Sequence, residues 1–309
     1  MKKYFLAFVL SLCTAQADYI WKNGKLIDFK RQPWMSMQEH YNDMMKAGDD
    51  RRWLDLIENG VVIINHFENS PFVDETRFMV AKAFLEIKDF SRAHDALGQY
   101  LTYTVTPKHY EEVMQMKLEL AHAFEDGEIK NLVGLPGIPH WVDARKEAVS
   151  LYDEIASALP TSFIAEQAVL GKAGLEIKLK DYRVAIATCE SFLRKYPKSS
   201  LAPQAFENIG FCQLQLIKDE FLDPDVLSLA ELNVKKFTEM YPAHPKLADI
   251  ENNVIQMKEL FAENLLQTGN YYKKVKQVNA ANFYYKKVIQ LYPETKSASN
   301  AQKILNKNT

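Results

Sequence analysis

The residue types that most often carry out catalysis or bind metals are scattered along this chain of 309 residues. Its seven histidines form no His-Glu-x-x-His pair and its three cysteines no Cys-x-x-Cys pair, so the usual spacings of a zinc site do not occur. No serine lies in a Gly-x-Ser-x-Gly turn. The segment Gly134-Leu135-Pro136-Gly137 lacks the lysine and the length of a phosphate-binding loop. We therefore expect no enzymatic activity, no cofactor and no metal site.

Charge is distributed unevenly along the sequence. The formal net charge of -2 gives no electrostatic reason to expect nucleic acid as a partner. Residues 271–309, however, contain eight lysines and one acidic residue, a net charge of +7, and aromatic residues alternate with these lysines. Two interpretations remain open: a solvated lysine face over an aromatic core, or a docking surface for an acidic protein. The candidate partner surface comprises Lys273, Lys274, Lys286 and Lys287.

The first 17 residues have the features of a secretory signal peptide. Lys2 and Lys3 precede a short apolar run, and Ala15-Gln16-Ala17 offers the small residues that a signal peptidase recognises. Only this segment could enter a membrane, because no later stretch approaches about 20 uninterrupted apolar residues. The sequence predicts export, with cleavage after Ala17.

Cys13 offers a second interpretation of the amino terminus. A cysteine directly after the apolar run can carry a lipid anchor, but bacterial lipidation signals place a small residue before it, and Leu12 stands there. We favour cleavage after Ala17 and keep lipidation of Cys13 open. The chain would then associate with a membrane either through a partner or through this anchor.

Two further cysteines lie in the second half of the chain. Export would place Cys189 and Cys212 in an oxidising compartment, where they could form a disulfide. Alternatively they are two buried free thiols, since cysteine packs as a small apolar residue. We favour the free thiols.

An internal repeat dominates the sequence. Four alanines precede a proline by twelve residues, and in three cases a tyrosine stands directly before that proline. A second small residue often lies twelve residues upstream of the alanine, as Ala173 does for Ala185 and Gly269 for Ala281. The alanine–proline pairs are Ala148 with Pro160, Ala185 with Pro197, Ala230 with Pro242, and Ala281 with Pro293.

This register is typical of a tetratricopeptide repeat, whose period is about 34 residues. Small residues let the two helices of one hairpin approach closely, apolar residues at helical spacing fill the seam, and the proline ends the second helix. The sequence predicts an all-α fold, a solenoid of helical hairpins wound into a right-handed superhelix.

About six repeat units fit into residues 36–309. They require inserts near 125–140 and 218–226, and the last residues form a partial capping helix. The insert near 125–140 combines glycines and prolines with aliphatic residues, so it either packs on its own hairpin or contacts a partner. In the lead segment 18–35, Asn23-Gly24 between two short apolar runs predicts a β-hairpin.

The first helix of each unit should line the concave face of such a solenoid. In the first two units that face would carry Tyr41, Met45, Phe78 and Lys82, a candidate peptide groove because aromatic and methionine side chains form adaptable surfaces. The alternative is that these side chains belong to the hairpin core.

Taken together, these features resemble the BamD (ComL/YfiO) family, the tetratricopeptide component of the outer-membrane β-barrel assembly machinery. The likeness spans most of 36–309 and is clearest where Leu132-Val133-Gly134 leads into Ala144, Ala148, Tyr152 and Pro160, and again in 284–301. Two features depart from the family: Leu12 before Cys13, and a sixth, carboxy-terminal repeat.

The resemblance implies a scaffold on the periplasmic face of the outer membrane. Such a protein would bind the periplasmic domains of a BamA-type barrel subunit and help to insert unfolded barrel proteins. The alternative is a soluble periplasmic tetratricopeptide adaptor of the CpoB (YbgF) type, tied to envelope constriction or peptidoglycan synthesis. That family carries an amino-terminal coiled coil, for which 18–35 is too short.

Overall fold

The computed structural model describes the chain except for six short stretches. The chain divides into two compact units, Met1–Ala168 and Val169–Thr309. The described residues are 19–22, 25–28, 32–126, 144–220 and 222–308. The predicted signal peptide, Cys13 and nearly all of the insert near 125–140 lie outside them.

Two short strands open the first unit. Strand β1 (Tyr19–Lys22) pairs antiparallel with β2 (Lys25–Asp28), with Tyr19 opposite Asp28 and Lys22 opposite Lys25. The strands flank the Asn23-Gly24 dipeptide, which favours a two-residue turn.

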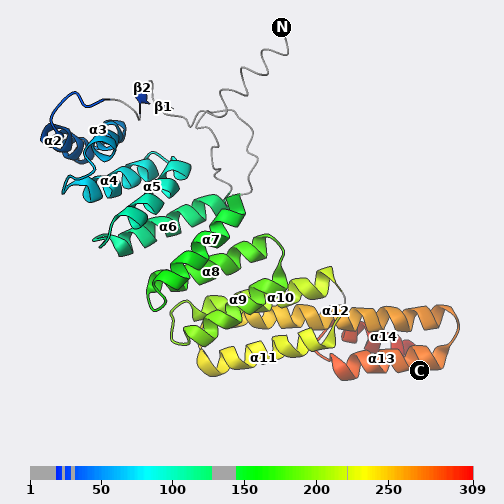
Figure 1. The fold of residues 1–309 in the computed structure, drawn as a ribbon. Helices are drawn as coiled ribbons and strands as arrows, with labels where there is room; N and C mark the ends of the chain where they lie inside the picture. Colours follow the sequence, from blue (N-terminus) through cyan, green and yellow to red (C-terminus); the bar gives the residue numbers. More distant parts are fainter. Residues whose placement is uncertain (1–18, 23–24, 29–31, 127–143, 221, 309) are drawn as a thin grey trace, which may run out of the picture. The chain divides into compact units, whose positions relative to one another are not determined.

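Helices follow one another in antiparallel pairs through the rest of the first unit (Figure 1). Ser36 caps the first of them by a reciprocal pair of hydrogen bonds with Glu39, which satisfies backbone groups that a helix start leaves free. The helices are α2 (Met37–Asp49), α3 (Trp53–His66), α4 (Val73–Glu86), α5 (Phe90–Tyr103), α6 (Tyr110–Glu125) and α7 (Ala144–Ala158).

The second unit continues the same pattern. Helix α8 begins just before the division between the units, and α12 is the longest helix described, at 28 residues. The helices are α8 (Phe163–Lys178), α9 (Tyr182–Lys195), α10 (Ala202–Asp219), α11 (Pro224–Met240), α12 (Leu247–Lys274), α13 (Val278–Leu291) and α14 (Lys296–Asn308). The thirteen helices of the described residues confirm the all-α, tetratricopeptide-type fold class.

Small residues lie at the closest helix contacts, as the repeat register requires. The alanines of the register are at most 2% exposed. At Gly269 a β-carbon would come within 2.7 Å of a ring carbon of Tyr285, so α12 and α13 can pack this closely only because residue 269 has no side chain. The buried alanines are Ala81, Ala93, Ala148, Ala173, Ala185, Ala230 and Ala281.

The Tyr-Pro pairs end their helices in one repeated geometry. Tyr196, Tyr241 and Tyr292 directly follow the last residues of α9, α11 and α13 as their C-caps, with φ between -126° and -139° and ψ between 55° and 58°. The proline that follows disfavours helical backbone at the residue before it, so each helix stops at the tyrosine. Each tyrosine carbonyl then accepts a hydrogen bond from the residue three positions later, over 3.1–3.2 Å.

The turns inside the hairpins also share a conformation. Arg51, Lys88, Lys180 and Lys276 adopt the left-handed region, with φ between 54° and 64°. Each follows the end of the first helix of a hairpin, where a left-handed residue lets the chain reverse direction. These turns could not be predicted from the sequence, because no glycine occupies the left-handed position.

Core residues of the second unit are shared between successive hairpins. One cluster joins α10, α11 and α12 through Leu214, Val226 and Met257, and another joins α12, α13 and α14 through Ala262, Tyr285 and Ala301. Because each core is completed by the following hairpin, stability accumulates from neighbour to neighbour along the chain.

Helix α12 begins at Leu247, and Ile250 and Val254 extend its buried stripe toward the amino terminus of the helix. The additional residues near 218–226 do not form a separate long loop. They are absorbed by α10, which continues to Asp219, and by α11, which begins at Pro224.

Candidate partner-binding surfaces

Several of the histidines that the structure describes connect neighbouring helices. His40 Nδ1 lies 2.8 Å from Asn59 Oδ1, between α2 and α3, and His122 Nδ1 lies 2.9 Å from the Tyr152 hydroxyl, between α6 and α7. In the described ranges no group of three or more histidine, cysteine, aspartate or glutamate residues is placed to hold a metal ion. None of the described helices is both long enough and apolar enough to cross a membrane.

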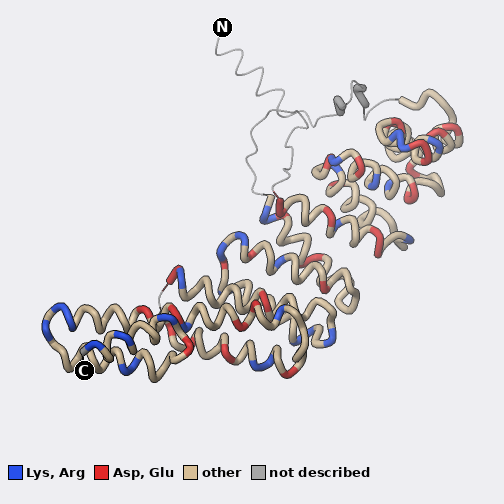
Figure 2. The backbone as a smooth tube through the Cα atoms, turned by 180° about the vertical axis from the view of Figure 1, so that it is seen from behind, with Lys and Arg blue, Asp and Glu red and all other residues tan. Residues whose placement is uncertain are grey.

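The lysines predicted as a partner surface lie on the α12–α13 hairpin, some at its turn and some in the second half of α13, and we call this surface the basic tip. It comprises Lys273, Lys274, Lys276, Lys286 and Lys287, on α12, α13 and the turn between them. All five side chains are exposed, and no ion pair is found for any of them in the described part of the chain. Figure 2 shows the lysines clustered at this end of the second unit.

Exposed aromatic rings accompany the lysines of the basic tip. The rings of Tyr272 and Tyr284 stack across the hairpin with centroids 5.4 Å apart and planes 9° from parallel. Tyr271 and Phe283 are 62% and 61% exposed. The tip therefore combines cations with apolar surface, a composition suited to contact with an acidic, partly apolar protein.

The expected groove on the first helices is only partly present. Phe78 is 3% exposed, and its ring stacks on His109 with centroids 4.0 Å apart, so it belongs to the core and offers no open surface. Tyr41 packs on Phe72, at 4.4 Å between centroids. Tyr41, Met45 and Lys82 are half-buried, and Lys82 Nζ lies 3.4 Å from Glu112 Oε1.

A deeper groove lies among α9, α10 and α11 and was not expected from the sequence. We call it the second-helix groove, because α9 and α11 are the second helices of their hairpins. It has a volume of about 450 Å³. Residues that line it include Arg194, Ile209, Gln213, Leu229, Leu232 and Met240.

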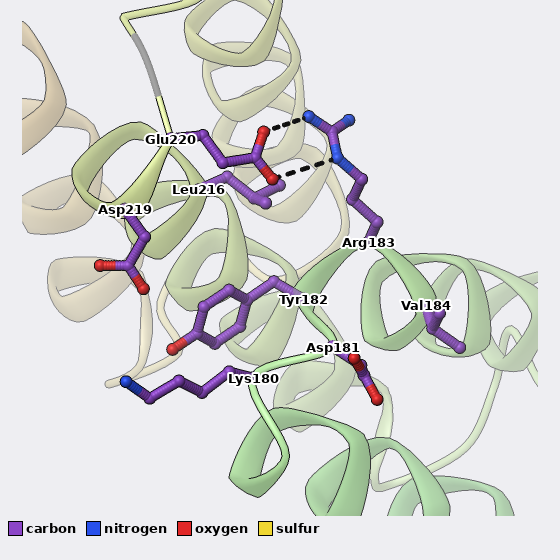
Figure 3. A pocket seen from close by; sticks show the side chains of 8 residues that line it. All are labelled: Lys180, Asp181, Tyr182, Arg183, Val184, Leu216, Asp219 and Glu220. Carbon is purple, nitrogen blue, oxygen red and sulfur yellow. Dashed lines mark hydrogen bonds and ion pairs between the residues drawn. The ribbon is translucent and has the colours of Figure 1, made fainter.

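A smaller, polar pocket of about 270 Å³ lies where α9 begins and α10 ends. Figure 3 shows the Arg183 guanidinium facing the Glu220 carboxylate, with Tyr182 and Lys180 below. Arg183 donates to both oxygens of Glu220, at 2.6 and 3.4 Å. This exposed ion pair connects the start of α9 to the end of α10. We therefore interpret the pocket as part of the junction between these two helices.

Cys189 and Cys212 are free, buried thiols, the interpretation favoured from the sequence. Burial raises the pKa of each thiol to about 12, so neither forms appreciable thiolate at neutral pH. They serve as small core residues of α9 and α10.

Helical hairpins joined through buried small residues and ended by Tyr-Pro pairs define the tetratricopeptide-repeat class of interaction proteins. The chain belongs to the YfiO family, described as outer membrane lipoprotein, whose sequence model matches residues 143–308. This match confirms the resemblance noted in the sequence. It begins after the insert near 125–140, so it covers less than the expected span of 36–309.

Other comparisons give more distant likenesses. None of the curated proteins compared with this chain matches it. Among solved structures, PilW, a widely conserved type IV pilus biogenesis factor, is 15% identical with a TM-score of 0.33, covering 86% of this chain and 99% of its own. The P58(IPK) TPR domain is also 15% identical, with a TM-score of 0.29, covering 86% of this chain and 76% of its own.

Proposed function

We propose that this protein is a non-enzymatic adaptor at the periplasmic face of the outer membrane. It binds the periplasmic domains of a BamA-type barrel subunit and helps to deliver unfolded barrel proteins to it. Membership of the YfiO family and the stack of helical hairpins support this role. The main observation in support of this role is the basic tip, an exposed surface of lysine and aromatic side chains.

The basic tip is the proposed contact with the barrel subunit. Residues 271–309 carry a net charge of +7 in a chain whose total is -2, so the tip attracts an acidic surface and the rest of the chain does not. Tyr271 and Phe283 supply exposed aromatic area on the same hairpin, and aromatic residues often contribute most of the binding free energy at an interface. Tyr41, Met45 and Lys82 are proposed as a weaker contact for unfolded barrel segments.

Photo-crosslinking in the cell envelope tests this assignment. A benzophenone side chain in place of Phe283 should crosslink to the BamA-type subunit. The same group in place of Tyr103, which is 65% exposed on α5, serves as the matched control and should give little of this product. Recovery of peptidoglycan synthases in place of the barrel subunit would support the CpoB-type alternative.

Attachment to the membrane is tested separately, by metabolic labelling with palmitate. If the amino terminus is cleaved after Ala17, neither the wild type nor Cys13→Ala takes up label, and the protein reaches the membrane through its partner. Label that is present in the wild type and lost in Cys13→Ala would show a lipid anchor at Cys13.

A further inference from the structure

The second-helix groove has apolar walls that nothing in the second unit covers. Leu229, Leu232 and Met240 are 54%, 43% and 47% exposed, although leucine and methionine are usually buried. They follow one another along α11, so the apolar wall is about 16 Å long at 1.5 Å per residue. Phe206 and Ile209 of α10 form an apolar floor.

Charged side chains stand at the rim of the groove. Arg194 of α9 and Lys236 of α11 are exposed and line it, and no ion pair is found for either in the described residues. Glu190 is the one carboxylate among the lining residues. The rim is therefore cationic on balance and favours an occupant that carries acidic side chains.

A buried amide on the floor of the groove lacks a partner. Gln213 is 4% exposed, and its Oε1 atom has no hydrogen-bond partner. The neighbouring Asn233 is satisfied, because its Nδ2 donates to the carbonyl of Phe206 over 3.0 Å. A buried oxygen without a donor costs free energy in the unbound protein, and a ligand that supplies one donor recovers it.

We propose that the second-helix groove binds an acidic amphipathic helix of a partner protein. The apolar face of that helix packs against Leu229, Leu232 and Met240, and its acidic residues lie beside Arg194 and Lys236. One polar side chain of the partner donates to Gln213. This site uses none of the residues of the basic tip and lies among α9, α10 and α11 of the second unit.

The lining favours a helix over an extended peptide. An extended segment needs partners for its backbone N–H and C=O groups, and Leu229, Leu232 and Met240 along the α11 wall have no polar side-chain group to supply them. A helix satisfies its backbone internally and presents only side chains. The straight wall of α11 suits the i, i+3, i+7 contacts of a helix laid in a groove.

Binding of a designed peptide tests the proposal. The probe is a fluorescein-labelled amphipathic helix of roughly 15 residues with leucine on one face and glutamate on the other, and the control peptide carries lysine in place of glutamate. Fluorescence anisotropy with the full chain should show binding of the acidic peptide at least about tenfold tighter than that of the basic one. Equal affinities for the acidic and the basic peptide would contradict the proposed preference of the groove for acidic side chains.

Variants locate the binding to the groove. Leu232→Glu and, separately, Arg194→Glu should each weaken the acidic peptide about tenfold, while Ile255→Glu, at a residue 50% exposed on α12, should leave it unchanged. The chain with Lys273, Lys274, Lys286 and Lys287 changed to glutamate should keep its groove affinity, which separates this site from the basic tip. Unchanged affinity in both groove variants would refute the proposal.

Replacement of Gln213 should affect the stability of the protein and its affinity for the probe in different ways. Gln213→Leu removes the unpartnered oxygen, so the melting temperature should stay equal or rise, while a probe that carries a serine facing this position should bind about fivefold more weakly. A lower melting temperature with unchanged probe affinity would show that the amide serves the fold, and would contradict its role in binding.

Discussion

Polar side chains hold neighbouring helices of this protein together at a small number of buried points. The ammonium group of Lys117, a residue only 4% exposed on α6, pairs with Glu154 of α7. The Tyr152 hydroxyl on α7 donates to Glu125 over 2.6 Å, and burial together with this bond raises the pKa of Tyr152. The buried ammonium group of Lys117 is satisfied by this pair, because an unpaired buried charge would be costly.

Glu259 gives a prediction for pH. Its carboxylate accepts hydrogen bonds from the backbone N–H groups of Lys296 and Ser297, over 2.7 and 2.9 Å, and thereby caps α14. Burial raises its pKa, but the hydrogen bonds from Ser297 and Lys296 outweigh burial and hold the pKa below its usual value. Because the folded pKa is depressed, the stabilisation is present above about pH 4.5 and is lost as the pH falls through the folded pKa.

We expect Glu259→Ala to lower the free energy of unfolding by about 1 kcal/mol at neutral pH, the usual cost of losing a helix cap. The difference from the wild type should shrink in acid, as measured by urea denaturation across pH. Glu251→Ala, at an exposed carboxylate on the same helix, is the control and should have little effect. A Glu259→Ala effect that persists undiminished at acid pH would argue against the capping role.

The two buried cysteines should be unreactive in the folded protein. Burial raises the pKa of Cys189 and of Cys212 to about 12, so both remain thiols well above neutral pH. A thiol reagent such as Ellman's should label neither residue in the mature, folded chain and both after unfolding in urea without reductant. If unfolding without reductant released no thiol, the two would be joined in a disulfide.

At the scale of the helical elements, two glycines should respond to the same substitution with opposite signs. Gly269→Ala places a methyl group within 2.7 Å of the Tyr285 ring and should destabilise the α12–α13 hairpin by about 1–3 kcal/mol. Gly174→Ala, inside α8 with no atom within 4 Å, should stabilise by up to about 1 kcal/mol. Thermal melts of both variants under one set of conditions provide the comparison, and two changes of the same sign would refute the packing argument.

The helical hairpins could be predicted because their signals are local. Ala185 and Ala281 stand at fixed distances from Tyr-Pro pairs, and each of these residues acts through contacts or backbone limits within one hairpin. The basic tip could be predicted for the same reason, since its lysines are close in sequence.

The second-helix groove could not be predicted, because it depends on contacts between hairpins. Leu229 and Leu232 flank the buried Ala230, and apolar residues there look like core until α9 is placed on the other side of α10. For the converse reason, the sequence left open whether Phe78 lines a groove or belongs to the core. It is covered by His109, which is 31 residues further along the chain and whose position depends on the following hairpin.

At the scale of the whole molecule, the proposed function depends on a separation of charge along the sequence. The sequence up to residue 270 is acidic, and the lysines are concentrated in the last hairpin and the helix after it. Exposed lysines act mainly on the rate of association, and their effect fades once salt shortens the Debye length to about 10 Å or less. Binding of the barrel subunit should therefore weaken with salt in the wild type.

The central claim is tested most directly by capture of the purified BamA-type periplasmic domains. The variant with Lys273, Lys274, Lys286 and Lys287 changed to glutamate should capture at least about tenfold less than the wild type at low salt, with its helicity and melting temperature nearly unchanged. The control changes four exposed lysines elsewhere, Lys46, Lys108, Lys198 and Lys218, and should retain most of the capture. Equal capture by the wild type and the tip variant at low salt would contradict the basic tip as the contact.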